Sequence, residues 1–129
     1  MLSYVQIVTV WVSDQERALD FYINRLGFEK RSDAEFGPGM RWLEVAPPGG
    51  QTSITLASGF GGEDWAARVG QDSGIVFDTP DIDATYQTLR ERGVEFTEPP
   101  TMQPWGMKQA LFVDQDRNGF VLVERSSGQ

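Results

Sequence analysis

The sequence predicts an α+β fold in which one strand–helix–strand–strand–strand (βαβββ) module occurs twice. The chain has 129 residues, the usual size of a single domain. Corresponding residues recur at a nearly constant distance: Gly27 and Gly93 lie 66 residues apart, and Asp14 and Asp81 lie 67 apart. Each repeat has one helix for about four strands, so we expect each helix to cover only one face of its sheet.

The first module is predicted over about residues 3–57. Residues 5–12 are β-branched and aromatic, which is typical of a strand, and Asp14 follows as a helix-capping residue. Apolar side chains then recur every three to four residues over 16–26, and Gly27 stands where a helix commonly ends. This part of the module is therefore a strand followed by a helix.

A hairpin completes the first module. Residues 40–46 alternate between apolar and polar side chains, the Pro-Pro-Gly-Gly segment 47–50 predicts a turn, and 52–57 predicts the returning strand. The glycine-rich segment 58–72 is expected to connect the two modules, with one short helical turn at most. The residues leave open whether this segment is a plain linker or a lid over a binding site.

The second module, about residues 73–125, repeats this order. Its predicted elements are a strand at 74–77, a helix from Asp81 to about Arg92, and strands at 109–113 and 120–124. The whole chain, 1–129, is then one domain of two modules. Each module has a sheet face that no helix covers. We expect these faces either to form a concave cup around a small molecule or to pack on each other or on a second subunit.

Composition excludes several classes of function. There are 19 acidic and 11 basic residues, and the net charge of −8 disfavours binding to nucleic acid or to anionic membrane surfaces. The chain has no cysteine and no histidine, which excludes thiolate zinc sites, cysteine nucleophiles and Ser-His-Asp triads. No opening segment resembles a secretory signal or a membrane span, so we expect a cytoplasmic protein.

Several segments resemble the glyoxalase/bleomycin-resistance/extradiol-dioxygenase group, the vicinal oxygen chelate superfamily. They are 12–22, 26–29, 81–86, 92–94, 104–106 and 114–119. The resemblance implies two tandem βαβββ modules that form a curved eight-stranded mixed sheet, the cup, with the helices on its outer face. It also implies a homodimer. Its members include isomerases, dioxygenases, lyases, thiol transferases and non-catalytic drug-binding proteins, so the fold alone does not fix the function.

Metal-using members of this superfamily take four ligands from equivalent places in the two modules. Carried over to this sequence, these places hold Ile7, Ser53 or Thr55, Gly74 and Val121. None of these side chains is a strong metal ligand. We therefore expect no metal and no cofactor, and neither metal-dependent lyase nor metal-dependent dioxygenase chemistry.

The candidate site residues follow from strand alternation. Trp11 has the same parity as Ile7 and Thr9, and the opposite stripe of valines should meet the helix. Trp42 and Glu44 likewise share one face, where a carboxylate beside an indole suits a cationic ligand. The predicted ligand-binding residues are Ile7, Thr9, Trp11, Trp42, Glu44, Thr55, Trp105, Phe112 and Val121.

Each candidate also has a purely structural interpretation. Trp11 fills a dimer or sheet contact, Glu44 is solvated and neutralised by Arg41, and Trp105 folds onto the edge of the core. Core packing explains Phe112 and Val121 equally well.

Three functions remain open at this point. The first is a metal-independent binding protein that sequesters a small aromatic or cationic compound, such as an antibiotic. The second is a lyase- or isomerase-type enzyme of the same fold that works without a metal, with Glu44, Asp78, Tyr4 or a group of the substrate itself transferring the proton. The third is an interaction module whose uncovered sheet faces serve assembly alone.

Overall fold

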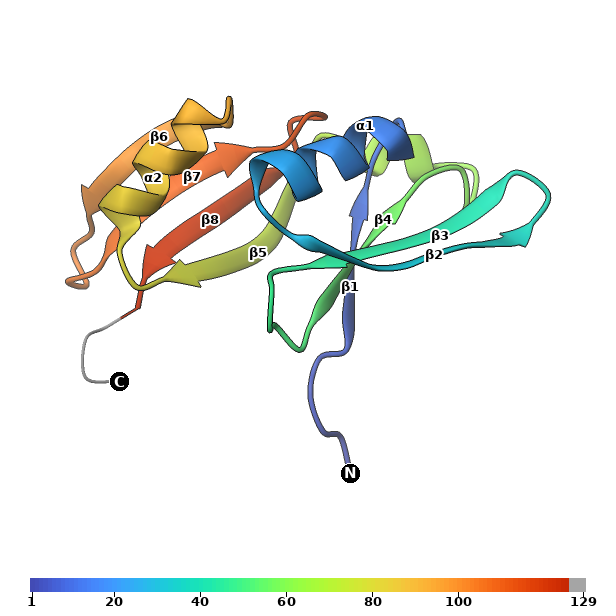
Figure 1. Ribbon diagram of the computed structural model, residues 1–129, viewed down its shortest axis with the longest axis horizontal. Coiled ribbons are helices and arrows are strands. Elements are labelled where there is room, and N and C mark those ends of the chain that lie inside the picture. The colour runs from blue at the N-terminus through green and yellow to red at the C-terminus, as the bar shows by residue number, and fades with distance from the viewer. Residues whose placement is uncertain (126–129) are drawn as a thin grey trace. The chain divides into compact units, whose positions relative to one another are not determined.

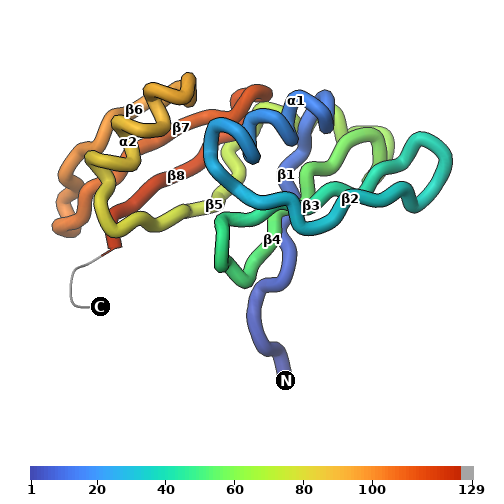
Figure 2. Tube along the Cα trace, in the orientation of Figure 1, coloured from blue at the N-terminus to red at the C-terminus, as the bar shows by residue number. Residues whose placement is uncertain are grey.

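A computed structural model describes residues 1–125, and the chain divides into two compact units, Met1–Gly70 and Gln71–Gln129. Figure 2 follows the chain through both units. The boundary between the units lies inside the predicted connecting segment 58–72, so most of that segment belongs to the first unit.

The first unit contains a four-stranded mixed sheet with strand order β1-β4-β3-β2 (Figure 1). β1 and β4 are parallel, whereas β4, β3 and β2 are antiparallel neighbours. Its elements are β1 (Ile7–Trp11), α1 (Gln15–Asp20), a π-helical turn η1 (Phe21–Arg25), β2 (Glu29–Gly37), β3 (Met40–Ala46), β4 (Ser53–Ala57) and a 3-10 turn η2 (Trp65–Arg68).

The first helix is shorter than predicted. Asp14 caps α1 by accepting hydrogen bonds from the backbone N–H groups of Glu16 and Arg17, as expected. The α-helix ends at Asp20 and continues as the π-helical turn, in which Leu26 N–H donates to the Phe21 carbonyl. The continuous α-helix predicted over 16–26 is therefore wrong in its second half. The wider turn buries the adjacent rings of Phe21 and Tyr22 together.

The core of the first unit lies between α1 and one face of the sheet. Side chains from three strands are buried there against the helix side chains: Val10, Val12, Leu43, Val45, Ile54, Leu56, Ala18, Phe21 and Tyr22. The Gln15 side-chain amide donates hydrogen bonds to the carbonyls of Arg41 and Leu56, at 2.9 and 2.8 Å. These two hydrogen bonds attach the start of α1 to β3 and β4, on one face of the sheet.

The second unit repeats the topology, with strand order β5-β8-β7-β6. Its elements are β5 (Asp72–Thr79), α2 (Ile82–Glu91), β6 (Glu95–Met102), β7 (Lys108–Val113) and β8 (Gly119–Glu124). Asp81 caps α2 through the Ala84 N–H, and Gly93 follows the helix with φ +89°, the counterpart of Gly27 at +79°. The predicted α+β fold of two βαβββ modules is thus confirmed, with the eight strands divided into two four-stranded sheets.

Aromatic side chains dominate the core of the second unit. Phe112 is 2% exposed, and its ring centroid lies 5.3 Å from Phe120 and 5.6 Å from Phe96, which in turn contacts Tyr86 of α2. Val121 pairs with Leu111, one residue from Phe112, and so points to the other face of the sheet. Phe112 is therefore not a ligand-binding residue on the uncovered face: it packs on the helix side, as its core-packing interpretation expects.

None of the helices within residues 1–125 is long and apolar enough to cross a membrane.

Candidate functional site

The sheet face opposite α1 carries a row of three side chains, Trp11, Ala57 and Trp42. Trp11 pairs with Ala57 across β1 and β4. Glu44 pairs with Thr55 across β3 and β4, and the same register, continued by two residues, places Trp42 beside Ala57. The indoles of Trp11 on β1 and Trp42 on β3 thus flank the small side chain of Ala57 on β4, the strand between them. We call this arrangement the indole slot.

Phe60 occupies the indole slot. Its ring centroid lies 5.8 Å from that of Trp11 and 6.4 Å from that of Trp42, with which it is stacked at an interplanar angle of 26°. Phe36 of β2 meets the ring of Phe60 edge-on at 5.3 Å. Aromatic pairs in such geometries attract one another beyond their burial of apolar area. The slot therefore has the dimensions and chemistry to hold a flat six-membered ring.

The segment after β4 folds back over Trp11. The Arg68 guanidinium lies over the indole of Trp11, 5.2 Å from the ring centroid. Gly61 has φ +91°, and a Cβ built at this position would lie 2.5 Å from Cη2 of Trp11. Only glycine fits so close to the ring with this backbone conformation. Part of the predicted connecting segment therefore covers the aromatic cluster instead of linking the modules directly.

A polar row lies next to the indole slot on the same face. Thr9, Thr55 and Glu44 are neighbours across β1, β4 and β3. The Trp42 indole N–H donates a 2.6 Å hydrogen bond to Oε2 of Glu44, which orients the carboxylate. Thr55 is 1% exposed, and its hydroxyl has no hydrogen-bond partner in the described part of the chain.

Glu44 is not neutralised by Arg41. The Arg41 guanidinium binds Asp33 at 2.7 Å and also Glu16 of α1, so it lies on the helix side of the sheet. The predicted neutralisation of Glu44 by Arg41 is therefore wrong, although Glu44 is partly exposed. Glu44 forms no salt bridge within residues 1–125. It therefore places a carboxylate beside the indole of Trp42.

The bond to Arg41 lowers the pKa of Asp33 from 3.8 to about 2. Because the folded state favours the carboxylate, the contribution of this pair to stability is complete above pH 4 and declines as the pH falls toward 2. Asp33→Asn should therefore destabilise by on the order of 1 kcal/mol at pH 7, a value reduced for solvent screening. Urea unfolding of both proteins should show this difference shrinking between pH 4 and 2; a difference that stays constant with pH would contradict the assignment.

The superfamily's metal place does not fit a metal in this chain. Thr9 and Val76 occupy equivalent positions, because each lies five residues before the aspartate that caps the helix of its module. Thr9 pairs with Thr55, and Val76 pairs with Val121. Thr55, and not Ser53, is therefore the counterpart of Val121. Of the four residues at the metal place, Thr55 offers one hydroxyl, and Ile7, Gly74 and Val121 offer no ligand atom in their side chains. Residues 1–125 also contain no cluster of three His, Cys, Asp or Glu side chains suited to a metal.

The remaining predicted residues belong to the second unit or lie apart from the indole slot. Trp105 is 64% exposed in the turn between β6 and β7, and Val121 is half-buried on β8. Asp78, a proposed proton carrier, pairs with Arg125 at 3.4 Å, and Tyr4 is exposed. The sequence left open whether Phe60, in the connecting segment, is a lid residue or a linker residue, and its ring contacts Trp11 and Trp42. Phe36, Ala57 and Arg68 were not predicted to lie near these indoles.

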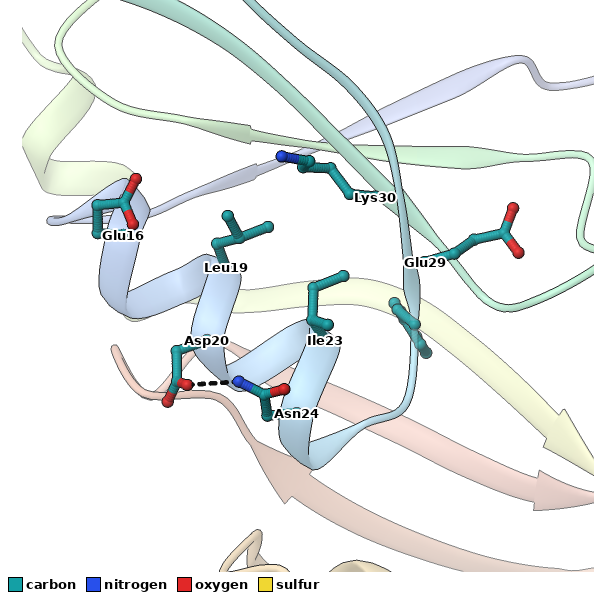
Figure 3. A pocket seen from close by; sticks show the side chains of 8 residues that line it. Glu16, Leu19, Asp20, Ile23, Asn24, Glu29 and Lys30 are labelled. Atoms are coloured by element: carbon teal, nitrogen blue, oxygen red, sulfur yellow. Dashed lines mark hydrogen bonds between the residues drawn. The ribbon is translucent and has the colours of Figure 1, made fainter.

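A hollow of about 400 Å³ lies apart from the indole slot, between the helical segment α1–η1 and the start of β2. In Figure 3, Leu19 and Ile23 of the helical segment lie across from Lys30 of β2, and Asn24 donates to Asp20. The carboxylates of Glu16 and Glu29 at its rim are already paired with Arg41 and Arg31. Phe28 is the one aromatic residue that lines this hollow, whereas two indoles flank the indole slot.

Comparison with known proteins places the chain in a family. Residues 4–122 match the Glyoxalase/Bleomycin resistance protein/Dioxygenase superfamily, and the protein belongs to it. The uncharacterized protein YetH of Bacillus subtilis (strain 168) is 36% identical over 127 residues, covering 96% of this chain and all of YetH.

Two crystal structures are similar over nearly the whole chain. One is a member of the same superfamily from Sphaerobacter thermophilus DSM 20745, with 50% identity, a TM-score of 0.89, and coverage of 96% of this chain and 98% of that one. The other is TnmS3, an antibiotic binding protein from Streptomyces sp. CB03234, with 39% identity, a TM-score of 0.82, and coverage of 97% and 98%.

Proposed function

We propose that this protein is a metal-independent binding protein for a small aromatic compound, and that the indole slot holds the ring of that compound. The observation that carries the proposal is the contact of the Phe60 ring with both indoles, Trp11 and Trp42. The side chain acts as an internal stand-in: it shows which shape the slot accepts. A bound ligand ring would take the place of Phe60.

Charge favours ligands that are neutral or cationic. Glu44 lies beside the slot without a cationic partner in the described residues, and the chain as a whole carries a net charge of −8. The resemblance to TnmS3 supports an antibiotic as one class of ligand, since that protein is an antibiotic binding protein. Ile7 and Thr9 on the same sheet face, and Trp105 and Val121 in the second unit, remain predicted contacts.

The test is a ligand panel measured by quenching of tryptophan fluorescence. The panel contains neutral bicyclic aromatics, aromatic cations, and aliphatic amines of matched size. We expect saturable quenching by aromatic members and none by the aliphatic amines. Trp42→Phe should remove most of the quenched signal, because Trp42 stacks on the ring in the slot. A panel in which no aromatic compound quenches saturably would overturn the proposal.

We also propose that the protein is a homodimer. Large apolar side chains are exposed in the first residues, Leu2, Tyr4 and Val5, and on the edge strand β5, where Val76 is 57% exposed. Edge strands and apolar surface of this kind are commonly covered by a second copy. Analytical ultracentrifugation at micromolar concentration should give twice the chain mass of 14.4 kDa; a species of 14.4 kDa would contradict a dimer.

A further inference from the structure

The polar row contains a buried hydroxyl that nothing in residues 1–125 satisfies. Thr55 Oγ1 lacks a hydrogen-bond partner although the residue is 1% exposed. A buried polar atom without a partner is costly, and native proteins retain few of them. Thr55 lies on the same sheet face as Trp42 and Glu44, so its hydroxyl is placed next to the indole slot.

Glu44 supplies the complementary half of this pair. Glu44 and Thr55 are directly opposite across β3 and β4, which places their Cβ atoms about 5 Å apart. Oε2 accepts the hydrogen bond from Trp42, and Oε1 accepts none in the described residues. An ionised carboxylate only accepts hydrogen bonds, whereas the threonine hydroxyl both donates and accepts. Together they can satisfy one group that donates at least one hydrogen bond.

We propose that Glu44 and Thr55 recognise a single hydroxyl or amino group on the edge of the aromatic ligand, an inference that rests on the proposed ring-binding function. A ligand hydroxyl would donate to Glu44 and accept from Thr55. An amino group would donate to both. A methyl ether cannot donate to the carboxylate, so the pair discriminates against it: Oε1 of Glu44 would be desolvated without a donor.

The distance along the strands sets the size of the ligand. Thr55 and Ala57 are two residues apart on β4, as are Glu44 and Trp42 on β3. Two residues of a strand span about 7 Å. This span matches a fused bicyclic ring that occupies the slot with one end and carries its polar group at the other. The chemical class is thus a hydroxylated or aminated aromatic of at least two rings.

The experiment compares 2-naphthol with 2-methoxynaphthalene by isothermal titration calorimetry. For the unmodified protein we expect about tenfold tighter binding of 2-naphthol. Thr55→Val, which replaces the hydroxyl by a methyl group of similar size, should reduce this ratio to about threefold and leave the affinity for the ether within twofold. Its melting temperature should not fall, because the variant loses an unpartnered hydroxyl.

Two further variants distinguish recognition from a change in packing. Thr55→Ser keeps the hydroxyl and should keep the tenfold preference. Glu44→Gln removes the charge, should lower the ratio, and should affect the ether little. Equal affinities of the unmodified protein for both compounds would overturn the recognition pair while ring binding stands. Failure of both compounds to bind would overturn the ring-binding function itself, and the recognition pair with it.

Discussion

Replacing Trp11 with alanine should weaken the binding of naphthalene-ring compounds by about 5- to 150-fold, equivalent to about 1–3 kcal/mol. Trp11 forms one wall of the indole slot, and its loss leaves a ligand ring stacked on Trp42 alone. The fold should lose less. Trp11 is partly exposed, so its truncation should cost about 1–2 kcal/mol of unfolding free energy, below the 3–5 kcal/mol typical of a fully buried tryptophan.

Ligand titrations and urea unfolding on the same variant separate these two effects. Trp11→Phe is the matched control, since it keeps an aromatic wall and should recover most of the affinity. A large loss of unfolding free energy with unchanged affinity would show that Trp11 is a structural residue covered by the segment that carries Phe60 and Arg68. It would also remove the main support for the slot as a binding site.

The placing of the two indoles is predictable from the sequence because strand geometry is local. Alternation along 5–12 puts Trp11 opposite the valines that meet the helix, and the structure buries Val10 and Val12 there. The same alternation places Trp42 on the opposite sheet face from Leu43 and Val45. The predicted capping aspartates and the glycines after both helices are also correct, since a cap depends on a few neighbouring residues.

The occupant of the slot is not predictable, because its position depends on contacts between distant segments. Residues 58–70 have no periodicity, and their glycines are compatible with many paths. Phe60 is placed by packing against Trp11 and Trp42, which precede it by 49 and 18 residues. The face on which Phe112 lies was not predictable for the same reason: whether Phe112 and Val121 share a face depends on the register between β7 and β8.

The π-helical turn escapes prediction for a different reason. Apolar spacing over 16–26 fits an α-helix, and the wider hydrogen-bonding pattern of the π-helical turn, which includes the bond from Leu26 to Phe21, leaves no sequence signal. The Arg41–Asp33 pair is likewise hidden, because it joins β3 to β2 across a register that only the structure supplies.

Replacing Phe60 with alanine should strengthen the binding of naphthalene-ring compounds by about tenfold. In the unmodified protein a ligand ring must displace Phe60 from its contacts with Trp11, Trp42 and Phe36. Aromatic pairs contribute about 0.5–1.5 kcal/mol each, so loss of the two indole contacts alone costs on the order of 1–3 kcal/mol. The alanine variant carries no such cost in the bound state, because its slot is already empty.

The direction of the change distinguishes a displaced ring from a ring that contacts the ligand. If Phe60 instead stayed in place and packed against the ligand, the Phe60→Ala variant would bind the ligand more weakly, as Trp11→Ala should. Stopped-flow quenching adds a second criterion. A ring that must first leave the slot limits the association rate at high ligand concentration, and this limit should disappear in the variant.

Phe36→Ala provides the matched control, since Phe36 is half exposed and meets Phe60 and Trp42 only edge-on. It removes a ring of the same size without emptying the slot, so affinity should change by no more than about threefold. Both variants should melt at a lower temperature, because each removes aromatic packing from the free protein. Only Phe60→Ala should combine a lower melting temperature with tighter binding, since in that variant alone a ligand ring enters the space that the deleted side chain filled.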